Sequence, residues 1–178
     1  YYGKMPARFK GNVQMYTVKG IKSELSIHGE GNKPNEAFKT RYALLKFSDL
    51  QEFVLDKLER ELPDFLYYHN VKHTVDVVTQ VELIGWGENI DDAELLLLKT
   101  AGLFHDAGHI ICYDDHEYHG TVLARQYLPK YGYTNQQIDT ICNRIMSTKL
   151  PPKPKNKLEA ILCDADLDYL GRSDMIPV

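Results

Sequence analysis

An apolar segment that ends in a histidine and an aspartate constrains the fold of this chain more than any other feature. Residues 93–107 carry apolar side chains on nearly every side of the helix that they would form, as is typical of a helix at the centre of a bundle. His105 and Asp106 close this segment, so both are expected to be buried. A buried carboxylate without a cation is rare and energetically costly. The segment therefore predicts an all-α fold with a cation at the end of its central helix.

A pair of histidines precedes this segment. His69 and His73 are four residues apart, a spacing that places two side chains on the same face of a helix. The apolar residues of 70–84 recur at helical spacing, although many are β-branched and would also suit a strand. The spacing favours a helix that presents both imidazoles to one pocket.

Periodicity also selects one carboxylate near the end of the sequence. Asp166 follows Leu162 by four residues and therefore lies on the inner edge of the expected last helix, whereas Asp164 points away. The expected metal ligands come from three helices and are His73, His105, Asp106 and Asp166.

The chemistry of this ligand set indicates the kind of ion. Two neutral imidazoles and two carboxylates suit a divalent transition metal ion such as Mn, Fe, Zn, Co or Ni, and the lack of thiolates argues against a closed structural zinc site. The alternative is a buried ion pair with a capping carboxylate. Because a bound ion activates water and offsets the charge of a phosphate, a phosphate ester is the expected substrate.

The order of these residues resembles the H…HD…D pattern of the HD superfamily of metal-dependent phosphohydrolases. Residues 68–73 (YHNVKH) resemble the YHNxxH segment of its cyclic-nucleotide phosphodiesterase branch. Residues 104–109 (FHDAGH) are similar to the FHDxGH element, and residues 164–171 (DADLDYLG) to the DADLDxLG helix of bacterial members. The resemblance covers roughly residues 50–171 and consists of four spaced elements in order.

This resemblance implies an ion held by the four ligands above and a metal-bound hydroxide that attacks phosphorus. It also implies that His69 protonates the departing oxygen and that Asp106 bridges to a second ion, for which Mg²⁺ is a further candidate. His109 and His116 can extend the site to that second ion, but each can equally cap a turn or orient a neighbour. Lys149 is the candidate for a phosphate contact, although lysines usually lie on the solvated surface.

The first 36 residues differ from the rest of the chain. Residues 13–21 are rich in β-branched and aromatic residues, which predicts one strand in a short β-containing arm. Residues 15–20 (MYTVKG) resemble the last strand of a class III nucleotide cyclase domain, so the arm is either a remnant of an upstream cyclase domain or an extension that packs on the helical body. Residues 37–178 are expected to form the helical domain. A link to a cyclase would favour a cyclic nucleotide as the substrate.

Capping patterns and glycines predict where helices begin and end. Three residue pairs have the spacing of a capping box: Ser48 with Gln51, Asp91 with Glu94, and Thr134 with Gln137. The first of these predicts a helix over 48–62 that ends before Pro63. Gly108 is placed to terminate the central helix. Together the patterns predict an HD-domain bundle of about five to seven helices.

Composition excludes some function classes. A net charge of −4 argues against general nucleic-acid binding, no run is long and apolar enough to span a membrane, and no secretory signal is visible. Three cysteines without CxxC spacing favour a reduced, cytoplasmic setting. Since the chain lacks an initiator methionine and ends soon after Asp166, we expect a fragment of a longer protein. Whether it forms a homodimer stays open.

The leading functional prediction is metal-dependent hydrolysis of a phosphate ester, with a nucleotide as the expected small-molecule partner. One alternative is a regulatory HD module that binds a nucleotide without turnover, and another is a nucleoside monophosphate phosphatase. The glutamine and aromatic residues that would grip a base cannot be placed in this sequence, so base specificity stays open.

Overall fold

The computed structural model describes residues 36–168, with side chains from residue 42 onward, and this part of the chain is all-α. Its elements are α2 (Glu36–Glu61), α3 (Val71–Gly87), α4 (Asp92–Phe104), η1 (Ala107–Ile110), α5 (His116–Tyr127), η2 (Leu128–Tyr131), α6 (Asn135–Ser147) and α7 (Lys157–Leu167). The predicted all-α class is confirmed for these residues. The strand predicted at 13–21 lies outside the described residues, and the division into an arm and a helical domain stays a prediction.

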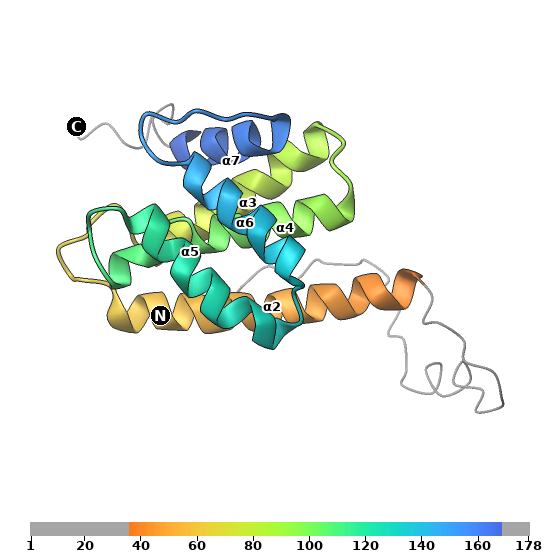
Figure 1. The fold of residues 1–178 in the computed structure, drawn as a ribbon, viewed down its shortest axis with the longest axis horizontal. Helices are drawn as coiled ribbons and strands as arrows, with labels where there is room; N and C mark the ends of the chain where they lie inside the picture. Colours follow the sequence, from red (N-terminus) through yellow and green to blue (C-terminus); the bar gives the residue numbers. More distant parts are fainter. Residues whose placement is uncertain (1–35, 169–178) are drawn as a thin grey trace, which may run out of the picture. The chain divides into compact units, whose positions relative to one another are not determined.

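Helix α4 is the central element of the bundle. It packs against α2, α3, α5, α6 and α7, and the ribbon shows it surrounded by these helices (Figure 1). Leu98, Leu103 and Phe104 are almost completely buried, as the apolar character of the segment predicts. The last turn of α4 therefore places the residues that follow it, His105 and Asp106, in the interior of the domain.

Helix α2 is longer than its capping pattern suggested. It begins at Glu36 and continues through Ser48, so Ser48 is not its N-cap and the predicted start was wrong. Residues 37–47 include several strong helix formers, and a serine that satisfies a helix start in one context is tolerated within a helix in another. Phe47, Leu50, Val54 and Leu58 form a buried stripe along α2, as is typical of an amphipathic helix.

Polar caps define the starts of the helices that carry the site. Asn70 accepts a hydrogen bond from the backbone N–H of His73 at 3.0 Å and is the N-cap of α3. Asp91 caps α4, and Thr134 and Gln137 form the predicted capping box of α6. Asn156 caps α7 by accepting from the backbone N–H of Glu159. Each cap stabilises its helix by about 1 kcal/mol.

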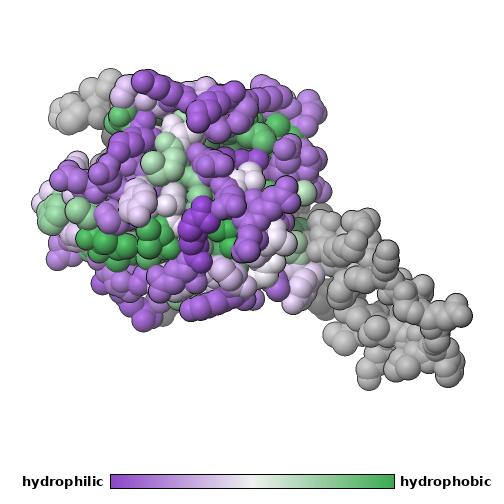
Figure 2. Space-filling view, in the orientation of Figure 1, coloured by the Kyte–Doolittle hydropathy of each residue, from purple (hydrophilic) through white to green (hydrophobic). Residues whose placement is uncertain are grey.

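The surface of the domain is mostly hydrophilic, with separate apolar patches on the face seen in the space-filling view (Figure 2). Among the helices that the structure describes, none has the length and apolar character needed to cross a lipid bilayer.

Candidate metal centre

Four side chains from three parts of the bundle converge in what we call the proximal nest: His73 from α3, His105 and Asp106 from the end of α4, and Asp166 from α7. The Nε2 atoms of His73 and His105 lie 3.2 Å apart. Asp106 Oδ2 is 3.4 Å from the first and 3.3 Å from the second, and Asp166 Oδ1 is 3.1 Å and 3.3 Å from them. The structure thus brings together the four ligands that the sequence predicted.

The end of α4 allows two adjacent residues to face the same point. Helix α4 ends at Phe104, and Asp106 adopts the φ of −99° and ψ of −2° of a turn, so its side chain leaves the helical direction. His105 Nδ1 lies 2.7 Å from the carbonyl oxygen of Gly102 and donates to it. This bond fixes the ring and leaves Nε2 to face the other ligands, as is usual for metal-binding histidines.

The charges of His105, Asp106 and Asp166 in the proximal nest strongly influence one another. Burial alone would lower the pKa of His105, but the carboxylates of Asp106 and Asp166 outweigh burial and raise this pKa well above its ordinary value. Burial alone would raise the pKa of each carboxyl group, but the His105 ring holds both well below their usual range. A buried and a partly buried carboxylate beside the same imidazoles favour a bound cation, whether a proton on the ring or a metal ion.

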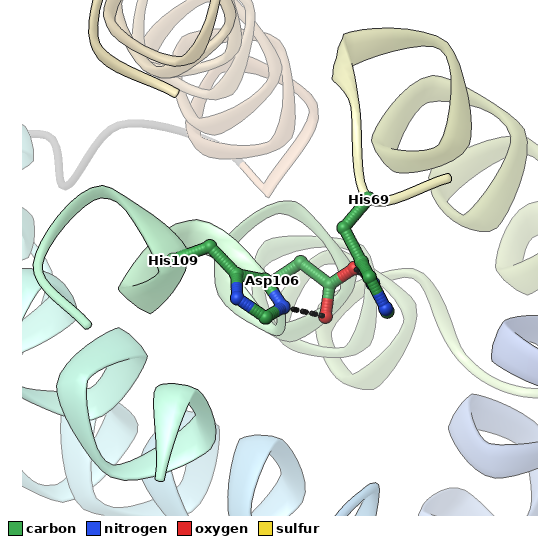
Figure 3. Close-up of side chains that lie close together, drawn as sticks. All are labelled: His69, Asp106 and His109. Atoms are coloured by element: carbon green, nitrogen blue, oxygen red, sulfur yellow. Dashed lines mark hydrogen bonds and ion pairs between the residues drawn. The ribbon is translucent and has the colours of Figure 1, made fainter. Parts of the chain in front are cut away.

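The other oxygen of Asp106 faces a distal nest, formed with His109 of η1 and His116 of α5. Asp106 Oδ1 lies 3.5 Å from His116 Nε2 and 3.9 Å from His109 Nε2, and the two imidazole rings stack with centroids 3.9 Å apart. Figure 3 shows the Asp106 carboxylate between the rings of His69 and His109. The Asp106 carboxylate therefore belongs to both nests.

His109 has unused metal-binding capacity. Both of its ring nitrogens are buried, and neither has a hydrogen-bond partner among the described residues, because 3.9 Å is too long for a hydrogen bond to Asp106. Burial, followed by repulsion from His116, lowers the pKa of His109 to about 4. The ring is thus neutral at pH 7 and retains a lone pair. Buried polar atoms without partners are rare, and an ion here would satisfy one of them.

Two glycines allow η1 and α5 to touch through their backbones. A Cβ atom on Gly108 would lie 1.9 Å from the carbonyl oxygen of His116 and 2.6 Å from the backbone nitrogen of Gly120. A Cβ atom on Gly120 would lie 2.6 Å from the carbonyl oxygen of Phe104. Only glycines permit this approach, which brings His109 and His116 together. Gly108 was predicted to end the central helix, but α4 ends at Phe104, and the role of Gly108 is close packing.

His69 reaches the site from a different place than predicted. The sequence placed it with His73 on one helix face, but Asn70 caps α3 and His69 precedes the cap, so that prediction was wrong. Its Nδ1 nevertheless lies 2.7 Å from Asp106 Oδ2. The side chain of His69 is 29% exposed, against 7% for His73. His69 therefore contacts Asp106 and is also partly exposed to solvent.

Two further residues differ in their relation to the centre. Lys149 is paired with Asp115 at the surface and contacts neither nest, so its predicted role in phosphate binding stays a prediction. Glu117 is buried, and its Oε1 lies 3.5 Å from His116 Nε2, close to the distal nest. Sequence reasoning missed Glu117. Its signal was the inward stripe of α5, in which Glu117 precedes buried Thr121 by four residues.

Divalent ion binding is expected to release a proton and to tighten as the pH rises. In the ion-free protein the raised pKa of His105 keeps a proton on its ring, and an ion must displace that proton. Below this pKa the apparent Kd for Mn²⁺ should fall by up to about tenfold per pH unit. Calorimetry in buffers of different ionisation enthalpy measures the released proton. His119→Gln, outside both nests, should keep the slope, and a Kd that is constant from about pH 5.5 to 8 would contradict this expectation.

Comparisons with known proteins agree with this geometry. The family model described as "HD domain" matches residues 70–168, which is more than half of the chain. A crystal structure of a predicted HD superfamily hydrolase from an uncultured Thermotogales bacterium aligns with a TM-score of 0.55 and 25% sequence identity, covering 66% of this chain and 67% of that chain. No curated protein matches the sequence. The matched segment contains every residue of both nests and begins one residue after His69, and the chain belongs to the HD domain family.

Proposed function

We propose that this chain is a metal-dependent phosphohydrolase whose centre is the Asp106 carboxylate. The observation that carries the proposal is that one buried carboxylate lies between two imidazoles, with the Nε2 atom of buried His105 at 3.3 Å and that of partly exposed His116 at 3.5 Å. A structurally similar HD superfamily protein is itself described as a hydrolase, which supports the same general class of reaction.

The side chains fit a divalent ion by their chemistry. His73, His105, Asp106 and Asp166 would hold it in the proximal nest, and Asp106 with His109 and His116 would hold another in the distal nest. A divalent ion there lowers the pKa of bound water and offsets the charge of a phosphate ester. The neutral state of His109 and the unused nitrogens of its ring support the distal assignment.

His69 is the proposed proton donor to the departing oxygen. Its Nδ1 donates to Asp106 Oδ2, so Asp106 orients the ring. The other nitrogen, Nε2, is the end of the ring that can hold a proton for transfer to a substrate. Partial exposure of His69 at the border of the buried nests suits a residue that must meet a substrate arriving from solvent.

Among phosphate esters, a cyclic nucleotide is the substrate that we propose. The resemblance of residues 68–73 to the phosphodiesterase segment supports it, and two residues of that segment, His69 and His73, contact Asp106 and Asp166. Purified protein loaded with Mn²⁺ or Co²⁺ should be offered cyclic nucleotides, nucleoside monophosphates and bis-p-nitrophenyl phosphate. Metal-dependent release of product supports the enzyme, with a preference for diesters expected. Tight nucleotide binding without turnover would instead support the regulatory alternative.

His69→Gln is expected to slow hydrolysis in proportion to the need for a proton donor. For a substrate with a poor alkoxide leaving group, kcat should fall by about 10²–10⁴-fold. For bis-p-nitrophenyl phosphate the loss should be much smaller, because p-nitrophenolate departs without a proton. Mn²⁺ affinity should change little. Equal losses for both substrates would show that His69 serves binding or folding instead, and His119→Gln provides the matched control.

A further inference from the structure

A concave site lies outside the two nests. A pocket of about 550 Å³ opens between the end of α6, the loop over residues 148–156 and the start of α7. Its volume is within the range of small-molecule sites in proteins. None of the residues of the two nests lines it. The proposed phosphohydrolase function therefore does not account for this pocket.

The pocket concentrates positive charge in a chain whose net charge is −4. Lys149, Lys153 and Lys155 line it together with one carboxylate, Glu159. The oxygens of Glu159 already accept from the Lys155 backbone N–H at 2.7 Å and from the Asn156 side-chain amide at 2.9 Å. Three lysines thus line the pocket together with one carboxylate that is held by neighbouring donors.

The ammonium groups are available to a ligand. Within residues 42–168, Lys153 and Lys155 have no ion-pair partner. Lys149 pairs with Asp115, a surface carboxylate whose side chain is 63% exposed, and such pairs contribute little free energy. An anion that enters the pocket can replace Asp115 at Lys149 at small cost. The lysine ammonium group acts as a point charge and commonly binds phosphate oxygens.

An apolar wall completes the pocket. Met146 and Leu150 line it and remain 38% and 71% exposed, with Pro151 beside them. An organic group packed here would remove this apolar surface from water. The combination of lysines and an apolar wall selects a ligand with both a phosphate and an apolar or planar part.

We propose that this pocket binds a phosphorylated small molecule such as a nucleoside polyphosphate, with its phosphates at the three lysines and its organic part against Met146 and Leu150. The site is joined to the metal centre by the Lys149–Asp115 pair, since Asp115 immediately precedes His116 of the distal nest. The proposal does not depend on hydrolysis at that centre.

Calorimetric titration of the protein with ATP and with tripolyphosphate, in EDTA so that no ion can hold phosphate at the nests, tests this site. Saturable one-to-one binding is expected, with the Kd raised at least tenfold in Lys153→Gln/Lys155→Gln. Lys130→Gln, an exposed lysine on η2 outside the pocket, should leave the Kd unchanged. ATP should bind more tightly than tripolyphosphate, and Leu150→Ser should remove that difference.

Absent binding, or an equal effect of the Lys130 and Lys153/Lys155 substitutions, would overturn the proposal whatever the hydrolysis assays show. Co-sedimentation with phosphatidic acid vesicles separates a lipid headgroup from a free ligand. Vesicle binding that depends on Lys153 and Lys155 while ATP does not bind would overturn the small-molecule assignment.

Discussion

Asp106→Asn is expected to abolish metal-dependent hydrolysis and to weaken ion binding in both nests at once. The asparagine keeps the shape of the side chain but removes the charge, and both carboxylate oxygens of Asp106 face imidazole nitrogens, Oδ2 at 3.3 Å from His105 and Oδ1 at 3.5 Å from His116. The kcat/KM for bis-p-nitrophenyl phosphate should fall at least about a thousandfold, equivalent to ~4 kcal/mol of transition-state stabilisation.

Asp164→Asn is the matched control for this prediction. Asp164 belongs to the same aspartate-rich motif as Asp166 but is exposed to solvent, as the periodicity of α7 predicted. Its substitution should leave kcat/KM and the number of bound Mn²⁺ ions unchanged. If Asp106→Asn retained more than about a tenth of wild-type activity, the charge of Asp106 would not be essential for hydrolysis.

Gly108→Ala is expected to destabilise the domain more than alanine at any other glycine of the described residues. Its Cβ would meet the backbone of α5 at 1.9 Å, where no side-chain rotation can relieve the contact. Either η1 and α5 separate, which displaces His116 from Asp106, or the fold weakens. Urea unfolding should show a loss of about 3 kcal/mol or more in the free energy of unfolding.

Gly87→Ala tests whether this effect is specific to the close approach. A Cβ atom on Gly87 would meet nothing within 4 Å, so this substitution should change stability by less than about 1 kcal/mol. The Mn²⁺ content of any folded Gly108→Ala protein should also fall, because the distal nest depends on the position of α5. Wild-type stability and Mn²⁺ content for Gly108→Ala would contradict the packing described for η1 and α5.

Periodicity in the sequence was sufficient to predict the helices that carry the proximal nest. The apolar character of residues 93–107 indicated a central helix, and α4 packs against all five other helices of the described domain. The four-residue step from Leu162 identified Asp166 rather than Asp164, and the structure places Asp166 Oδ1 3.1 Å from His73. Local pattern determines which side of a helix faces inward, so the inward position of these side chains could be predicted, while their role as ligands stays a prediction.

The features that the sequence did not reveal depend on contacts between segments. The entry of the chain into α3 places His69 before the helix, and only the tertiary fold brings it to Asp106. His109 and His116 were named from the sequence as residues that can extend the site, but their position beside Asp106 depends on the backbone contact of Gly108 with α5, which periodicity cannot indicate. The burial of Glu117 was not predicted. Helix starts such as that of α2 were missed because a capping sequence does not fix where a helix begins.

An anomalous-scattering map from a crystal of this protein grown with Mn²⁺ tests the central claim most directly. A peak is predicted in the proximal nest, with Nε2 of His73, Nε2 of His105 and oxygens of Asp106 and Asp166 as its protein ligands. A second, weaker peak between Asp106, His109 and His116 would extend the assignment to the distal nest. The absence of any peak within reach of Asp106, with these side chains turned apart, would contradict the metal-centre account.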